Sequence, residues 1–219
     1  LTQLRLIRGS YRKSLSDEST GTASEWLRDN YYILHREGRA AAESLAQMRA
    51  IPCDKDGIPV VYRLVRDFFV ETRCTVDQEN IDTFLGVLNR HMTLYEQELE
   101  AILDFFRAAL IDCCFTAITS DCLPKEATTM MAYAIPGLRA LDGVDFLTLI
   151  ETHSPVEKIL SEDPAGAYTE MDEDTRFLYR YKIAKRAEKE GVAEAELAKA
   201  MIRQAKMGQT PRMRHVGAY

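Results

Sequence analysis

The sequence predicts an all-α fold, a multi-helix bundle of about eight to nine helices that ends in an antiparallel helical hairpin. Apolar residues recur with helical spacing in several segments, most clearly in Val60–Phe69, where they stand at i, i+1, i+4, i+5, i+8 and i+9. Helix start and stop signals separate these segments. No segment alternates apolar and polar residues between turn signals, so no sheet is expected.

The first half of the chain begins with residues 1–22, which we expect to be a poorly structured lead-in with a helical turn or two at most. A long helix should run from about Ser24 to Arg49 and end before Pro52. A second helix starts at Pro59, because proline is tolerated in the first turn. A third covers about 77–90.

The widest apolar face belongs to a helix expected from Thr93 to about Ser120, which should therefore be the central helix of the core. Thr93 and Glu96 have the spacing of a capping box. Pro124 starts the next helix, which Pro136 should kink or break. Residues 23–208 are expected to form a single helical domain, with a subdivision near residue 123.

The last third should contain two short helices and the hairpin. Asp145 caps one short helix, and the segment from Ser154 to Glu157 is a second capping box that starts the other. The hairpin helices cover about 172–190 and 194–206, and Gly191 ends the first. Residues 209–219 should be a tail with little fixed structure that leads to the rest of a longer polypeptide.

The composition argues against a nucleic-acid-binding protein, a membrane-spanning segment and a zinc site. The formal net charge of −6 argues against nucleic-acid binding by bulk electrostatics. The most apolar stretch, Leu99–Thr119, carries four charged residues, so we expect a soluble piece that does not span a membrane. The five cysteines lack CxxC or zinc-site spacing, which favours reduced thiols in a cytosolic-type compartment.

Motifs for catalysis are missing from the sequence. It contains no glycine-rich phosphate loop, nucleophile elbow or HExxH motif. The four histidines are scattered, and carboxylate pairs such as Glu151 with Asp172 are expected by chance among 34 acidic residues. The sequence therefore predicts no catalytic residue, no metal and no cofactor.

The densest polar pattern lies in the turn and helix start of residues 163–180, and its members are Asp163, Asp172, Arg176, Tyr179 and Arg180. The last three stand at i, i+3 and i+4, which places them on one helix face. Two arginines and a tyrosine could hold a phosphate or sugar hydroxyls. They could equally bind carboxylates and helix ends within the fold, as a structural clamp.

A second candidate is a buried polar anchor formed by Trp26, Asp29 and Asn30. Trp26 and Asn30 share an apolar helix face, and a buried amide without partners costs about 1–3 kcal/mol. Asn30 should therefore bond either to a neighbouring backbone group or to a ligand.

Two blocks of sequence resemble one known family. Trp26–Ile33 resembles the W-L-x-D-N-Y-Y segment of cyclic β-1,2-glucan synthases, and a second block of that family resembles Leu138–Arg180. The matching residues in the second block are Leu138, Arg139, Glu151, Ser154, Val156, Glu157, Leu160, Asp163, Pro164, Ala165, Gly166, Tyr168, Met171, Asp172, Thr175, Arg176, Tyr179 and Arg180. His215–Tyr219 is similar to the H-V-G-x-Y that closes the block.

The resemblance implies a parent that is a large membrane-bound transferase, which builds β-1,2-glucan from UDP-glucose. This piece resembles the helical region that precedes the glycosyltransferase domain, on the cytoplasmic side of the cell membrane. It has no Asp-x-Asp motif and no sheet, so the piece itself is not expected to transfer sugar, and its partners would be the other domains of the parent.

Besides an independent helical enzyme, two functions remain open at this point. The first is a non-catalytic accessory or scaffolding module with an exposed apolar patch where other domains dock. The alternative is a module that binds glucan or a sugar nucleotide and holds the growing chain. That alternative predicts a groove with exposed aromatic rings, for which the candidates are Trp26, Tyr31, Tyr32, Tyr168 and Tyr179.

Overall fold

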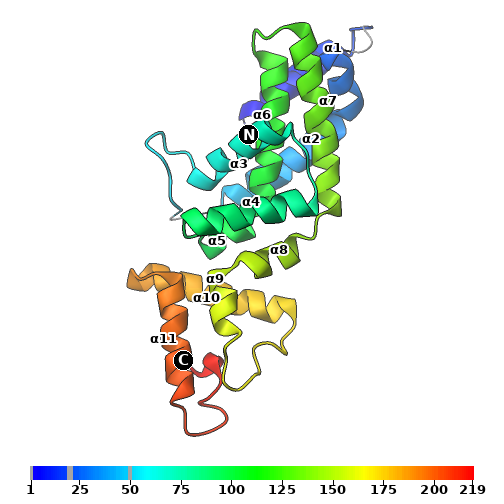
Figure 1. Cartoon of the computed structure of the whole chain (residues 1–219). Helices are drawn as coiled ribbons and strands as arrows, with labels where there is room; N and C mark the ends of the chain where they lie inside the picture. The colour runs from blue at the N-terminus through cyan, green and yellow to red at the C-terminus, as the bar shows by residue number, and fades with distance from the viewer. Residues whose placement is uncertain (1, 19–21, 49–50) are drawn as a thin grey trace. The chain divides into compact units, whose positions relative to one another are not determined.

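The structure is a computed structural model that describes residues 2–18, 22–48 and 51–219 (Figure 1). Within these ranges it contains eleven α-helices, two short 3₁₀ helices and no strand, which confirms the all-α prediction. An isolated bridge joins Cys53 and Pro59 in the loop between two helices.

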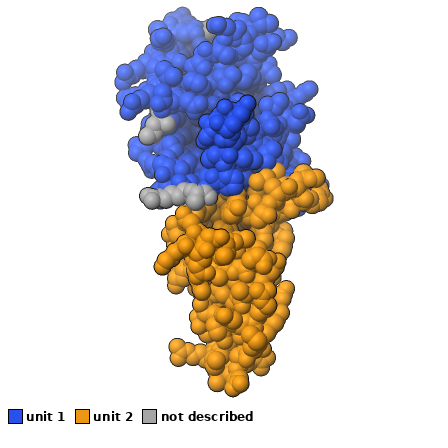
Figure 2. Space-filling model, turned by 90° about the vertical axis from the view of Figure 1, so that its left-hand side faces the viewer, with its two compact units in different colours: residues 1–84, 101–144 blue, residues 85–100, 145–219 orange. Residues whose placement is uncertain are grey.

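The chain divides into two compact units. Unit 1 comprises residues 1–84 and 101–144, and unit 2 comprises residues 85–100 and 145–219 (Figure 2). The division into units does not fall near residue 123, which lies in the short connection between two helices that pack on each other in unit 1. The first division falls instead inside α4 (Gln78–His91).

Unit 1 is built around one apolar helix. Its elements are α1 (Thr2–Ser14), α2 (Ala23–Leu45), α3 (Val60–Thr72), the first half of α4, α6 (Ile102–Thr119), α7 (Pro124–Ala140) and η1 (Leu141–Gly143). α6 packs against α1, α2, α3 and α7, which confirms its expected central position. α7 continues through Pro136 without a break.

The lead-in is more ordered than expected. Residues 2–14 form α1, whose Ile7 is buried and which packs on α2. Tyr11 stacks on Tyr31 with ring centroids 4.0 Å apart and planes 7° apart. This helix could not be predicted with certainty from the sequence, because its few apolar residues are interspersed with basic ones and give no clear apolar stripe. The rest of the predicted lead-in, at residues 19–21, lies outside the described residues.

Four phenylalanine rings form the centre of unit 1. Phe106 makes edge contacts with Phe68, Phe69 and Phe84, with ring centroids 5.9, 5.3 and 6.0 Å apart. Phe69 and Phe106 are fully buried. Edge-to-face pairs of this kind are worth about 0.5–1.5 kcal/mol beyond the area they bury.

Unit 2 contains the end of α4 and a set of shorter helices. They are α5 (Glu96–Glu100), α8 (Phe146–His153), α9 (Pro155–Leu160), α10 (Glu173–Glu190), α11 (Glu194–Lys206) and η2 (Val216–Ala218). The expected helix from Thr93 to Ser120 is therefore two helices, which separate at Ala101.

The helix starts in unit 2 follow the sequence signals in part. Asp145 accepts from the Thr148 amide and Ser154 from the Glu157 amide, as the capping pattern predicted. The capping box at Thr93 is wrong, because α5 begins at Glu96 and it is the Tyr95 amide that donates to Glu98 Oε2, at 3.0 Å.

The hairpin of α10 and α11 has the expected form, and Gly191 ends α10 with a left-handed φ of 68°. Residues 209–219 differ from the expected tail. They turn back onto α11, where Val216 is fully buried among the apolar residues of the hairpin. A single buried valine and the bonds described below hold this segment in place.

Candidate functional site

The polar centre of unit 2 starts from the cap of α9. Ser154 accepts from the Glu157 amide at 2.9 Å, and Pro155 fits the first helical position. This geometry fixes Glu157 in the first turn of α9, where the residue is 5% exposed. Its carboxylate does not reach back to the helix start, as the expected capping box requires, but points to α10.

Glu157 is the hub of the network. Its Oε2 accepts from the Tyr168 hydroxyl and from Arg180 Nη1, each at 2.6 Å, and its Oε1 accepts from Arg176 Nη1 at 3.2 Å. Arg176 Nη2 also pairs with Glu151 at 2.7 Å. A buried carboxylate is costly unless it is paired and hydrogen-bonded, and these partners fill both of its oxygens.

The pairing governs how the buried groups titrate. Burial opposes the charged form of Arg180, but the hydrogen bond and charge of Glu157 outweigh burial and raise the pKa of Arg180. Burial, followed by the bond to Glu157, raises the pKa of Tyr168. Both side chains therefore keep their protons as donors to Glu157.

A second carboxylate, Glu96, approaches Arg180 from α5. Its Oε1 accepts from the Ser154 hydroxyl at 2.5 Å, and its Oε2 lies 3.4 Å from Arg180 Nε, too poorly aligned for a hydrogen bond. Burial raises the pKa of Glu96 to about 7. Ser154 thus links the two carboxylates, since its hydroxyl donates to Glu96 and accepts from the Glu157 amide.

Further acids lie beside Glu96. Glu194 Oε2 accepts from the Glu96 amide at 2.9 Å, so the first residue of α11 caps the start of α5. Burial raises the pKa of Glu100 to about 7 and also raises the pKa values of Glu98 and Glu194. Burial disfavours the ionised form of all four acids, and the charge of Arg180 opposes this effect at Glu96 and Glu100 only.

Asp163 anchors the C-terminal segment. Its Oδ1 accepts from the Val216 amide at 2.9 Å, and its Oδ2 lies 3.0 Å from His215 Nδ1. Because an ionised carboxylate only accepts, Nδ1 carries the proton. The Tyr179 hydroxyl lies 3.2 Å from His215 Nε2 and completes a chain from Asp163 to α10.

The five residues predicted as one polar cluster thus divide into three arrangements. Arg176 and Arg180 meet at Glu157, while Asp163 and Tyr179 meet at His215. Asp172 caps α10 and accepts from the Thr175 amide at 2.8 Å, which lowers the pKa of its carboxyl. Arg176, Tyr179 and Arg180 all lie on α10, but their partners are acids and a histidine of the same chain.

Sequence reasoning missed most of these partners as members of the site: Glu96, Glu157, Glu194, Ser154 and His215. Glu157 had a signal, since the third helical position of a buried capping segment points its side chain at the next element. Glu96 and Glu194 had none, because 98 residues separate them.

The second candidate, in unit 1, holds for one residue of three. Asn30 is buried, donates to the Trp26 carbonyl at 2.8 Å and accepts from Arg139 Nη2 at 2.6 Å. Trp26 is only half-buried. Asp29 is exposed, with 61% of its side chain accessible, so it is not part of a buried anchor.

The aromatic residues expected to form a sugar platform do not share one. Tyr168 is fully buried, Tyr31 stacks on Tyr11, and Tyr179 bonds to His215. Tyr32 is 60% exposed. The rings also belong to different units.

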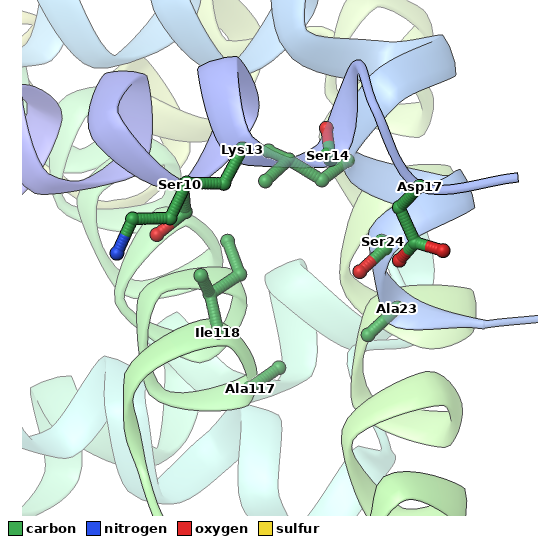
Figure 3. A pocket seen from close by; sticks show the side chains of 9 residues that line it. Ser10, Lys13, Ser14, Asp17, Ala23, Ser24, Ala117 and Ile118 are labelled. Atoms are coloured by element: carbon green, nitrogen blue, oxygen red, sulfur yellow. The ribbon is translucent and has the colours of Figure 1, made fainter. Parts of the chain in front are cut away.

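A polar hollow lies at the surface of unit 1. It has a volume of about 360 Å³ and is lined by α1, α2 and α6 (Figure 3). Figure 3 shows hydroxyl and charged side chains on the α1 and α2 side, namely Ser10, Lys13, Ser14, Asp17 and Ser24, with Ala117 and Ile118 from α6. Lining of this kind could accept small polar molecules.

Within the described ranges, no group of three or more His, Cys, Asp or Glu side chains is arranged to hold a metal ion. Among the described helices, none is both long and apolar enough to cross a bilayer.

The sequence matches no protein-family model, no curated protein and no solved structure.

Proposed function

We propose that this chain is a non-catalytic helical scaffolding module of a glycosyltransferase similar to cyclic β-1,2-glucan synthases, which makes glucan from UDP-glucose. The module would pack on the other domains of its parent at the cytoplasmic side of the cell membrane. Its conspicuous polar cluster would hold unit 2 together and would not hold a ligand.

One observation carries this proposal. The polar residues of the block that resembles the synthases are each other's partners: Glu157 with Tyr168, Arg176 and Arg180, Glu151 with Arg176, and Asp172 with Thr175. A motif whose members bond to each other specifies a fold. It leaves few donors or acceptors in the cluster for a sugar.

The surface of α10 supports a docking role. Phe177, Leu178 and Tyr181 are each exposed by 41–44%, and the Phe177 and Tyr181 rings stack with centroids 6.3 Å apart. Large apolar side chains gathered on one exposed helix face are typical of interaction surfaces. We assign this face to the transferase domain of the parent enzyme.

Binding to a separately expressed transferase domain of a cyclic β-1,2-glucan synthase tests the docking role. We expect the two proteins to co-elute in size-exclusion chromatography, and Tyr181→Glu to abolish co-elution. Leu147→Glu is the matched control, since Leu147 is 58% exposed on α8 of the same unit. Separate elution of the wild-type proteins, or equal loss in the control, would count against the proposal.

The hollow of Figure 3 favours the alternative, a module that binds glucan or a sugar nucleotide. Calorimetric titration with linear β-1,2-gluco-oligosaccharides and with UDP-glucose separates the two functions. The scaffold predicts no saturable heat. Saturable binding that Arg176→Ala or Tyr179→Ala removes would overturn it in favour of the cluster, and binding removed by Ser14→Tyr would place the ligand in the hollow.

A further inference from the structure

Cys74 occupies an unusual backbone position in unit 1. It follows the end of α3, and it and Arg73 have left-handed φ values of 58° and 50°, the positive values found among the described non-glycine residues. Such values are uncommon for residues with a Cβ. The Cys74 amide bonds to the Phe69 carbonyl at 2.9 Å. The turn is therefore fixed in a conformation that the residue type does not favour.

Tight packing from α7 fixes the same turn. A Cβ built on Gly137 would lie 2.7 Å from the Cys74 carbonyl oxygen, closer than atoms of this kind can approach. The absence of a side chain at Gly137 thus lets the turn lie directly against α7. The backbone of Cys74 is therefore held from both sides.

Cys74 and Cys113 of α6 line the same hollow, and their thiols interact. This interaction lowers the pKa of the Cys113 thiol and Arg66 lowers it further, while burial and the charge of Asp112 oppose the shift. The same interaction and burial raise the pKa of Cys74, which keeps its proton. One thiol is thus the better nucleophile and the other its protonated partner.

Both cysteines are reachable from solvent through one hollow. It has a volume of about 410 Å³, and its lining includes Cys74, Cys113, Arg73, Thr129 and Tyr133. Cys113 is half-buried, whereas its neighbour Cys114 is fully buried with a pKa raised by burial. The hollow therefore exposes one of two adjacent cysteines on α6 to small reagents.

We propose that Cys74 and Cys113 form a redox-sensitive dithiol site that a low-molecular-weight disulfide, such as glutathione disulfide, converts into an internal disulfide. This inference does not depend on the proposed function.

The reaction is a pair of thiol–disulfide exchanges. The Cys113 thiolate attacks one sulfur of glutathione disulfide, breaks its S–S bond and releases one glutathione thiolate. That thiolate takes the proton of Cys74. The Cys74 thiolate then attacks the Cys113 sulfur and releases the second glutathione, which takes the proton that Cys113 had given to solvent. Two cysteines are oxidised, and one glutathione disulfide is reduced to two thiols.

The test is peptide mapping of the whole chain after equilibration in glutathione buffers of graded oxidised-to-reduced ratio. Free thiols are blocked in acid, and trypsin then cuts without reductant. Cleavage after Arg73 and Arg107 places Cys74 in peptide 74–90 and Cys113 in peptide 108–125. We expect these two peptides to become linked as the ratio rises, with a mass lower by two hydrogens than their sum.

Peptide 108–125 also contains Cys114 and Cys122, so cysteine variants are needed to identify which of its sulfurs is linked to Cys74. The linked species should be lost in Cys113→Ser and retained in Cys114→Ala and in Cys122→Ser. It should also be lost in Cys74→Asn, in which Asn tolerates the left-handed backbone and keeps the turn folded. Linkage that persists in Cys113→Ser overturns the proposal, as does wild-type protein that forms only glutathione adducts at every ratio.

Discussion

In unit 1, Phe106 packs edge to face with Phe68, Phe69 and Phe84, whereas in unit 2 the buried centre places Glu157 against Arg176 and Arg180. Among described residues, unit 2 buries seven polar or charged side chains and unit 1 four, although unit 2 is smaller. Ring packing depends on shape and volume. An ionic centre depends on every partner being present, because a charge left alone inside a protein is expensive.

The contrast predicts its largest effect at Arg180. Arg180→Met fits the site sterically but leaves Glu157 and Glu96 without their shared cation, so the free energy of unfolding should fall by about 3–5 kcal/mol. Urea denaturation with linear extrapolation measures this loss. Arg186→Met, on the same helix but in an exposed pair with Glu190, is the matched control and should cost less than about 1 kcal/mol. Equal losses of unfolding free energy in the two variants would contradict the distinction between the buried and the exposed ion pair.

The two centres should also respond differently to conservative changes. Glu157→Gln keeps size and shape but removes the charge that two arginines share, and it should cost about 2–3 kcal/mol. Leu34→Met, in the core of unit 1, exchanges two apolar side chains of similar volume and should cost less than about 1.5 kcal/mol. Urea denaturation of both variants under the same conditions measures the two losses. A larger loss for Leu34→Met would reverse the expected order.

Acidity should stabilise unit 2. Burial raises the pKa of Glu96 to about 7 from 4.5, so the folded chain binds this proton more tightly than the unfolded chain. The stabilisation is complete below the unfolded value and is lost as pH rises through about 7, a change on the order of 1–3 kcal/mol.

The urea midpoint at about pH 5 should therefore exceed that at about pH 8, and Glu96→Gln should reduce the difference. Glu196→Gln, an exposed acid on α11, should leave it unchanged. An undiminished difference in Glu96→Gln would assign the pH dependence to other groups.

The smallest expected effect concerns shape alone, in unit 1. Alanine favours a helix over glycine, yet Gly137→Ala should destabilise by about 1–2 kcal/mol, since its Cβ would meet the Cys74 carbonyl at 2.7 Å. Gly9→Ala in α1 meets open space and should stabilise by about 0.5–1 kcal/mol. Thermal unfolding of both variants shows whether each substitution raises or lowers the stability of the protein. A stabilising Gly137→Ala would show that the turn at Cys74 yields easily.

The fold class was predictable because apolar stripes such as Val60–Phe69 need no knowledge of partners. α1 and the separation of α5 from α6 were not. The first has few apolar residues, and at Ala101 no glycine or proline marks the break. In both cases tertiary packing decides what local preference leaves open.

The side chains that α10 contributes to the candidate site were predictable from the sequence, but most of their partners and the arrangement of the site were not. The position of Arg176, Tyr179 and Arg180 on one helix turn follows from helical spacing. Their partners lie far along the chain, since Arg180 is 23 residues from Glu157 and Tyr179 is 36 residues from His215. Sequence spacing alone therefore could not decide whether these residues form an internal clamp or bind a ligand.

A double-mutant cycle between Glu157 and Arg180 tests most directly whether the cluster is an internal clamp. The free energies of unfolding of Glu157→Gln, Arg180→Met and the double variant give the coupling energy between the two side chains. An internal clamp predicts a coupling of about 2 kcal/mol or more, against about 0.3–0.5 kcal/mol for the exposed pair of Arg186 and Glu190. A Glu157–Arg180 coupling no larger than that of the exposed pair would contradict the structural role assigned to the cluster.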